Sequence, residues 1–506
     1  MYPFLRLALC ILAFTSVASF AFGSNDHQKC RFAPLYKART ILKDPEPFIE
    51  DLLYWEGRFA RPGVGYNGAN GMTYDGTLLD FHTGLELAHR SGLHNFSAAS
   101  KESLHVMVLA QALAGDEGAA KFLSPEHPKQ APNVAFNLMK QKLNTYLAFN
   151  ESYPGFGGFL PWFNNTFATI EPTSDWVNRV PALDNGELVW AVYAAIGVLS
   201  TSSRSEFQAL GAQWQHWLDY TKSHAARLFY RGDGVVCAVT TLHQSLLPSD
   251  PEQNYTCEGS GVLNDPYEGE LFAWWLYFFG GLSAHQKQAI WTAKRPQLQS
   301  VEYRRGRNGS PITVQKGFWF SSHEQWKVLE MPYYDVDIVK RVYTNAERVR
   351  TCNSVAKGIP GLYASVNNVT NTTTGEIIGY ISNAGIPSVS NQTEQELDVI
   401  TPYGVFPTLL VDGVRGRAVG MAWWWTMVMG KKMQNPYGST ESERVDGTAV
   451  SSFVSWDSKI TTVSALLGGV VDLVRDKMKK EGIYKDFVRV LNVSRPRCSR
   501  QSQHTD

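Results

Sequence analysis

Three segments of the chain are apolar on almost every face of a helix. They run from Leu183 past Tyr193, from Tyr267 to Phe279 and from Ala418 to Met429. A helix that is hydrophobic on every face must be buried on all sides. We therefore predict that these three helices lie in the interior of the protein, and that Trp423, Trp424 and Trp425 serve mainly for packing there.

Other segments carry their apolar residues on a single stripe, as helices with one buried face do. They are Phe48–Trp55, Ala135–Leu147, Glu206–Leu228, Ala284–Trp291 and Val336–Val349. An amphipathic segment follows each of the first two fully apolar ones, which is the order expected of an inner ring of helices wrapped by an outer ring. The pattern predicts a mainly α fold, an (α/α) toroid.

Shorter elements are expected on the rims of this toroid. The strand-like runs Gly234–Leu242 and Thr313–Phe320 predict hairpins, and the Asn-, Thr- and Ser-rich stretch Tyr363–Asn391 predicts an exposed loop. No linker-like run divides the chain. We expect residues 24–506 to form a single domain, because a toroid can reach this size.

The first residues predict export. A basic Arg6 precedes the apolar run Leu7–Phe22, and small residues follow, so residues 1–23 have the pattern of a signal peptide. A membrane anchor is the less favoured alternative, because the run is short for a span. N-glycosylation sequons occur along the chain and agree with secretion: Asn95, Asn150, Asn164, Asn254, Asn308, Asn368, Asn371, Asn391 and Asn492.

Charge and cysteine content exclude several classes of partner. Lys plus Arg and Asp plus Glu number 47 each, which argues against a nucleic acid or a membrane as partner. No zinc-type spacing is present, so we expect no metal and no cofactor. Cys237 with Cys257, and Cys30 with Cys498, are possible disulfides, but the sequence leaves their pairing open.

Acidic residues stand at the start of two of the fully apolar helices. They are Asp184 and Glu187 in the first, and Asp265, Glu268 and Glu270 in the second. Inner helices of a toroid begin at the same end, so these carboxylates would converge on one cleft. A D-x-x-E capping arrangement is the alternative explanation for Asp184 and Asp265. Glu268 and Glu270 adjoin apolar rings that favour the protonated form of a carboxyl, as a general acid requires.

Cleavage of a glycosidic bond needs a second carboxylate, which activates water or attacks carbon. Asp75, Asp80 and Asp446 are candidates from the residue pattern alone. A helix cap is the alternative for Asp75, and a turn is the alternative for the Asp446-Gly447 pair.

Aromatic segments would suit a carbohydrate, since sugar rings stack on aromatic faces. Gly155–Phe163 predicts a loop that presents rings, and the segment from Phe318 to Tyr334 offers Trp319, His323, Trp326 and Tyr333. A large core is the alternative explanation for so many aromatic residues. A serine hydrolase is disfavoured, because no G-x-S-x-G motif is present.

Four segments, together with the signal peptide, resemble fungal endo-β-1,2-glucanases of glycoside hydrolase family 162, relatives of bacterial family 144. They read DNGELVWAVYA, NDPYEGELFAWW, FSSHEQWKVLEMPY and RVDGTA, after the signal peptide. The resemblance implies an (α/α)6 barrel that hydrolyses β-1,2-glucan with inversion and releases sophorooligosaccharides.

The resemblance also implies roles for residues. It makes Glu268 the general acid, with Glu270 as the alternative, and Asp446 the general base, which acts through a substrate hydroxyl. Asp184 and Glu187 become binding or supporting residues. A polysaccharide lyase and a non-catalytic glycan-binding protein are the competing hypotheses, and the acidic character of the motifs argues against the first of them.

Overall fold

The computed structural model describes residues 32–494, with internal gaps. Those gaps are 81–82, 88–90, 167, 248–252, 264–268, 307–308, 318–319, 322–323, 360–362, 364–365, 368–379, 382–385, 391–398, 412, 430–432, 449 and 452. The proposed signal peptide, Cys30 and Cys498 lie outside the described residues, as does most of the predicted loop Tyr363–Asn391.

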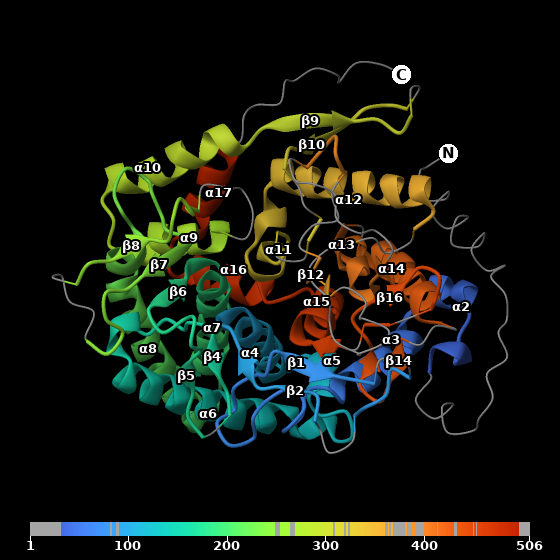
Figure 1. Cartoon of the computed structure of the whole chain (residues 1–506), viewed down its shortest axis with the longest axis horizontal. Helices are drawn as coiled ribbons and strands as arrows, with labels where there is room; N and C mark the ends of the chain where they lie inside the picture. Colours follow the sequence, from blue (N-terminus) through green and yellow to red (C-terminus); the bar gives the residue numbers. More distant parts are fainter. Residues whose placement is uncertain are drawn as a thin grey trace.

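An inner ring of helices surrounds the centre of the molecule (Figure 1). It consists of α4 (Ala99–Leu113), α7 (Ala182–Thr201), α9 (Gly269–Phe279), the short α11 (Lys327–Glu330), α13 (Phe406–Val411) and α15 (Trp456–Leu467). Helix α7 contacts α4 and α9, α13 contacts α15, and α15 contacts α4, so the first and last inner helices meet. This is the (α/α)6 toroid that was predicted.

The outer ring carries the amphipathic helices together with the apolar helix α14. They are α6 (Ala131–Ser152), α8 (Ser205–Phe229), α10 (Ala284–Lys294), α12 (Asp337–Lys357), α14 (Gly413–Val428), α3 (Glu46–Gly57) and α5 (Glu117–Leu123). Each predicted amphipathic segment is confirmed as part of one of these helices, with its apolar stripe turned to the core.

Helix α14 is apolar for a different reason from the one its pattern suggests. It lies in the outer ring, between α13 and α2 (Ala38–Lys43), rather than in the inner ring. The N-terminal segment covers its outer face: Phe32 and Phe48 contact the Trp424 ring, with centroids 5.9 and 5.7 Å away. The prediction that the helix is buried is confirmed, whereas its assignment to the inner ring is wrong.

Helices α4 and α15 belong to the inner ring but have no clear apolar pattern. Their buried faces carry polar residues whose partners come from other helices. Glu102 pairs with Lys142 at 2.7 Å, and Lys459 pairs with Glu56 at 2.7 Å. Because such pairs offset the cost of burial, these helices can be buried without being hydrophobic.

Short antiparallel sheets cover the end of the ring where the inner helices begin. Their strands are β1 (Gly76–Leu78), β2 (Leu93–His94), β3 (Phe96–Ser97), β4 (Phe163–Asn164), β5 (Glu171–Pro172), β6 (Arg179–Pro181), β7 (Val239–Thr241), β8 (Thr256–Cys257) and β17 (Phe453–Ser455). Strand β1 pairs with β17, with Gly76 opposite Ser455. The sheet therefore joins segments that are far apart in the sequence.

Other strands form two-stranded pairs. They are β9 (Ser300–Tyr303) with β10 (Ile312–Gln315), β11 (Val366–Asn367) with β12 (Tyr380–Ile381), β13 (Val399–Ile400) with β16 (Glu443–Arg444), and β14 (Gln434–Asn435) with β15 (Gly438–Ser439). Of the predicted hairpin run Thr313–Phe320, residues 313–315 lie in a strand, β10, but its partner β9 precedes the run, so the strand is confirmed and the bounds of the hairpin are wrong. The run from Gly234 contributes β7, the middle strand of the β6–β7–β8 sheet.

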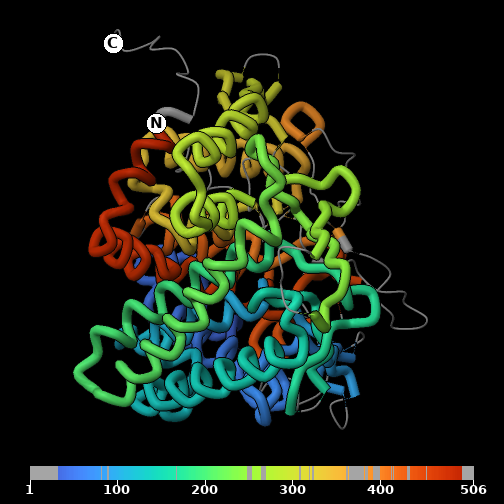
Figure 2. The backbone as a smooth tube through the Cα atoms, turned by 90° about the vertical axis from the view of Figure 1, so that its left-hand side faces the viewer, coloured from blue at the N-terminus to red at the C-terminus, as the bar shows by residue number. Residues whose placement is uncertain are grey.

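Helices α16 (Val471–Lys480) and α17 (Tyr484–Ser494) lie at the opposite end of the ring. Figure 2 shows this C-terminal segment in red, on the other side of the molecule from the yellow-green segment that contains β7 and β8. Helix α16 packs on α7, where Tyr193 hydrogen-bonds Glu481 at 2.8 Å. Short 3-10 turns complete the fold at Ala33–Leu35, Pro128–Gln130, Pro154–Phe156, Arg295–Gln297, Tyr333–Asp335 and Pro402–Val405.

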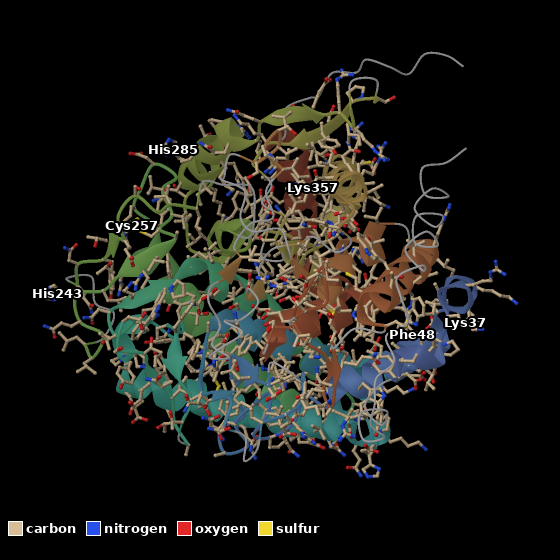
Figure 3. The ribbon with its side chains drawn as sticks, turned by 45° about the vertical axis from the view of Figure 1, so that its right-hand side comes forward. Lys37, Phe48, His243, Cys257, His285 and Lys357 are labelled. Carbon is tan, nitrogen blue, oxygen red and sulfur yellow. A yellow bond between two sulfur atoms is a disulfide. The ribbon has the colours of Figure 1, made fainter. Side chains whose placement is uncertain are left out.

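A disulfide joins Cys237 to Cys257, as the sequence allowed, and fastens β8 to the segment before β7. Figure 3 places Cys257 at the opposite edge of the molecule from Phe48. Cys352 is the unpaired cysteine among the described residues. Helix α7 is long and apolar enough to cross a membrane, yet 78% of that window is buried within the protein, as expected of a core helix.

Candidate active site

Charged side chains from three inner helices meet where those helices begin. Lys101 of α4 contacts Asp457 of α15, with 3.0 Å between Nζ and Oδ2. Asp184, in the first turn of α7, is held near Lys101. Three helices far apart in the sequence therefore place two carboxyls around one ammonium group.

Asp75 adds a third carboxyl to this group. It immediately precedes β1, and its oxygens lie 3.9 Å from Lys101 Nζ and 3.6 Å from His94 Nδ1. Since Asp75 begins a strand and not a helix, the capping explanation for this residue is wrong. Asp80 accepts bonds from the backbone and side chain of Thr83, as expected of a local turn.

Burial changes the acidity of two of these carboxyls. Burial raises the pKa of Asp184, against the opposing effects of the Lys101 charge and of hydrogen bonds with Trp162 and Ser100. Burial also raises the pKa of Asp457, and the nearby charges of Asp75 and Asp184 add to that rise, whereas Lys101 opposes it. Such a cluster holds protons to a higher pH than isolated carboxyls do.

Asp184 does not cap its helix. Helix α7 begins after Pro181, and Asp184 is the third residue of its first turn, where its Oδ2 accepts a 3.0 Å bond from Trp162 Nε1. The capping alternative for Asp184 is therefore wrong. In α15, by contrast, Ser455 caps the helix in a capping box with Ser458, which leaves Asp457 available for Lys101.

Glu187 and Glu270 lie deeper in the same ring. Glu187 is buried in α7, one turn beyond Asp184. Glu270, only 2% exposed, accepts bonds from Lys327 Nζ at 3.1 Å and from the Tyr333 hydroxyl at 2.9 Å. Tyr333 in turn accepts a bond from Trp274. Glu270 is thus fixed in a buried network at the start of α9.

The remaining predicted site residues are either buried or outside the described residues. Glu268, Trp319 and His323 lie outside the described residues, so their roles stay predictions. Trp326 is fully buried and donates to Thr461 Oγ1, and Tyr333 is also fully buried, so neither side chain lies at the protein surface. Their contact with a substrate also stays a prediction.

Asp446 lies on an exposed turn after β16. Its Oδ1 accepts bonds from the Thr448 backbone N–H at 2.9 Å and from the Thr448 hydroxyl at 2.7 Å. Gly447 between them has φ +73°, a conformation that favours glycine. The turn explanation for this segment is confirmed, and the turn leaves the carboxylate accessible.

The aromatic loop presents fewer rings than its sequence suggests. Phe156, Phe159 and Phe163 are fully buried, and Trp162 is 38% exposed. Trp162 therefore carries the exposed aromatic surface of that segment. The edge of its ring contacts Asp184, because Nε1 donates a hydrogen bond to Oδ2.

Asp457 and Lys101 were missed by the sequence reasoning. Both stand in the first turn of an inner helix, like Asp184, but α4 and α15 lack the apolar pattern that marks α7. The signal that would have found Asp457 is the sequence Ser455-Trp456-Asp457-Ser458, a capping box with an acid in the first turn.

The cluster has the chemical character of an acid–base site. Carboxyls with raised pKa can transfer protons near neutral pH. Its lysine is paired with carboxylates, which does not fit the basic site that a lyase acting on uronates would need. No group of three His, Cys, Asp or Glu side chains in the described parts of the chain could hold a metal ion.

Comparisons with known proteins identify the family of the chain. The family model described as Endo-beta-1,2-glucanase SGL matches residues 72–498. The chain is also similar to a solved endo-beta-1,2-glucanase from Talaromyces funiculosus in complex with sophorose, with 59% identity over 92% of both chains and a TM-score of 0.88. A glutamate-to-glutamine mutant of that enzyme, in complex with beta-1,2-glucan, matches with 58% identity, the same coverage and the same TM-score.

More distant similarity extends to bacteria. An endo-beta-1,2-glucanase from Chitinophaga pinensis matches with 12% identity over 88% of this chain and 98% of its own, at a TM-score of 0.58, which shows a shared fold. The comparison with curated proteins gave no match.

Proposed function

This chain belongs to the endo-β-1,2-glucanases of glycoside hydrolase family 162, and from that premise we propose how its residues hydrolyse internal bonds of β-1,2-glucan. The observation that carries the proposal is the convergence of Lys101, Asp184 and Asp457 at the start of their helices. Helix α9 begins at the same end, because Gly186 of α7 lies against Phe272 of α9.

We assign the general acid to Glu268, which immediately precedes α9. There it would protonate the leaving oxygen of the glycosidic bond. We assign the general base to Asp446, whose exposed turn suits a group that receives a proton through a substrate hydroxyl. Inversion of the anomeric carbon follows from this pairing, since one carboxyl acts as acid and the other as base.

The experiment compares the wild type with E268Q, E270Q and D446N on β-1,2-glucan. Loss of a general acid or base costs about 10²–10⁴-fold in rate. We expect this loss in E268Q and D446N, and proton NMR of the wild-type reaction should show the α-anomer first. If E270Q loses activity while E268Q retains it, the acid is Glu270. If the β-anomer forms first, the inverting mechanism is wrong.

We also propose that the protein is secreted after cleavage near residue 23. The pattern of residues 1–23 and the sequons support this, and the Cys237–Cys257 disulfide is typical of an oxidising compartment. N-terminal sequencing of protein from the culture medium should find a start near Ser24. An intact Met1 on that protein would contradict the proposal.

A further inference from the structure

The turn that carries Asp446 lies at the tip of a hairpin with two arms. The first arm contains β16, and the second arm leads to β17. Glu443 pairs with Val450 across the arms, and nearer the tip the Gly447 N–H donates to the Arg444 carbonyl at 2.9 Å. Asp446 is exposed, whereas Glu443 and Val450 are buried. The position of the carboxylate therefore depends on how the buried end of the hairpin is held.

Thr440 joins the two arms at this buried end. Its hydroxyl donates to the Ser451 carbonyl at 2.7 Å and lies 3.1 Å from the Phe453 carbonyl. The backbone adds two bonds, from the Glu441 N–H to the Phe453 carbonyl at 3.1 Å and from the Ser451 N–H to the Ser442 carbonyl at 2.7 Å. These five residues form the root of the hairpin, and the Thr440 side chain closes it.

A second threonine holds the root from the neighbouring strand. Thr401, which follows β13, donates to the Glu441 carbonyl at 2.7 Å, and β13 pairs with β16, where Ile400 lies opposite Glu443. Thr401 and Thr440 are each 1% exposed. A hydrogen bond in the interior is stronger than one in water, and a buried carbonyl that loses its donor finds no water to replace it. The two hydroxyls are therefore suited to hold the root in one place.

We propose that Thr440 and Thr401 are positioning residues for the hydrolysis. Their hydroxyls fix the hairpin root, and the root keeps Asp446 within reach of the substrate hydroxyl through which it receives a proton. Both side chains are buried, so each acts through Asp446 and not on the substrate itself. This inference rests on the proposed function, because it takes Asp446 to be the general base.

The test measures kcat and KM of T440V and T401V on β-1,2-glucan. Valine keeps the branched shape and removes the hydroxyl. We expect each variant to lose about 5- to 30-fold in kcat, within the roughly 10²-fold that a misplacement of about 1 Å can cost. KM should stay nearly unchanged, because the base acts in the transition state. T440S keeps the hydroxyl and should recover most of the wild-type kcat.

T240V is the matched control for the loss of a buried hydroxyl. Thr240 of β7 is fully buried, and its hydroxyl donates to the Leu228 carbonyl at 2.8 Å, away from the hairpin. T240V should have a lower thermal midpoint, as T440V should, but the kcat of the wild type. This comparison separates an effect on stability from an effect on the reaction.

A double-mutant cycle tests whether Thr440 acts through Asp446. The base is already lost in D446N, so T440V should lower kcat far less in that background than in the wild type. An equal loss in both backgrounds would show that Thr440 only supports the fold, and the proposal would fail. It would also fail if T440V kept the wild-type kcat, or if T440S were as slow as T440V. If circular dichroism shows that T440V does not fold, the same cycle with T401V decides.

Hydrogen exchange adds a measurement that does not depend on activity. Exchange reports local opening, so the Gly447 N–H should exchange faster in T440V and T401V than in the wild type, and at the wild-type rate in T240V. Unchanged exchange in T440V and T401V would overturn the proposal. Full activity of D446N alone would instead refute the assignment of the general base. Exchange at Gly447 would then still show whether the two threonines hold the turn.

Discussion

Lys101 influences the acidity of the site because its positive charge lies among three carboxyls. It approaches Asp75 and Asp457, and its charge lowers the pKa of Asp184 and Asp457 against the effect of burial. Removal of one positive charge would leave a group of carboxyls that repel one another. The ammonium group thus allows three acids to share a small volume.

K101M should therefore raise the pKa of Asp184 and Asp457. A carboxyl with a higher pKa is ionised only at higher pH, so the acidic limb of the pH–activity profile should move upward by about one unit, the low end of the effect of a neighbouring charge. The measurement is kcat/KM from pH 3 to 8. K121M breaks the more exposed pair with Glu50 and should leave the acidic limb of the pH–activity profile at the wild-type pH. An acidic limb that does not move in K101M would refute the argument.

Glu330 of α11 is fully buried, and neither of its oxygens has a hydrogen-bond partner among the described residues. Burial raises its pKa well above the usual value. The folded protein therefore keeps the proton to a higher pH than the unfolded chain does. The protonated Glu330 contributes its full share to the free energy of unfolding below the pKa that it has in the unfolded chain. That contribution is lost as the pH rises from there toward the pKa in the folded protein, by at most about 1.4 kcal/mol per pH unit.

E330Q cannot ionise, so its free energy of unfolding should fall less between pH 5 and pH 8 than that of the wild type. Urea denaturation at several pH values measures this difference. E117Q, at an exposed position of α5, serves as the control and should follow the wild type. If the free energy of unfolding changes with pH equally in E330Q and in the wild type, Glu330 is already ionised in the folded protein.

Among elements, α14 shows how a segment outside the toroid completes it. Phe32 and Phe48 enclose the Trp424 ring, and Trp425 Nε1 donates to the Ala33 carbonyl. The N-terminal segment thus supplies the outer cover that the other outer helices do not require. An outer helix can then be apolar on all faces.

W424A should lower the free energy of unfolding by about 3–5 kcal/mol, the usual cost of removing a buried large aromatic side chain. Chemical denaturation followed by circular dichroism measures the change. L147A, at an exposed position on α6, should change stability by less than about 0.5 kcal/mol. A similarly small effect in W424A would show that the N-terminal segment does not seal α14.

The apolar patterns of α7 and α9 and the stripes of α6, α8, α10 and α12 could be read from the sequence, because packing demands hydrophobic residues at those positions. Helices α4 and α15 could not, since their buried Glu102 and Lys459 depend on Lys142 and Glu56. Tertiary pairing of this kind leaves no local signal. Asp184 was found as a site residue because it opens a fully apolar helix, whereas Lys101 and Asp457 open helices without that pattern.

At the scale of the whole molecule, the ring closes through contacts between early and late segments. Strand β1 pairs with β17, α4 contacts α15, and Lys101 reaches Asp457. Because each inner helix packs on others of the ring, none of them has a core of its own. We therefore expect residues 32–494 to unfold as one cooperative unit.

Differential scanning calorimetry should then show one transition whose calorimetric and van't Hoff enthalpies agree. A V454P variant tests the closure directly, because proline lacks the N–H that an antiparallel strand pair uses. It should lower the midpoint of that single transition. Two separate transitions in the wild type would mean that the toroid contains independent parts.

Pairing of β1 with β17 also has a consequence during synthesis. Asp75 and Asp184 emerge from the ribosome early, whereas Asp457 and the strand that closes the ring emerge among the final residues. Contacts between such distant segments form late, because loop closure must precede them. A nascent chain, or one ended by a premature stop codon before β17, would therefore hold most of the helices and none of the hydrolytic activity.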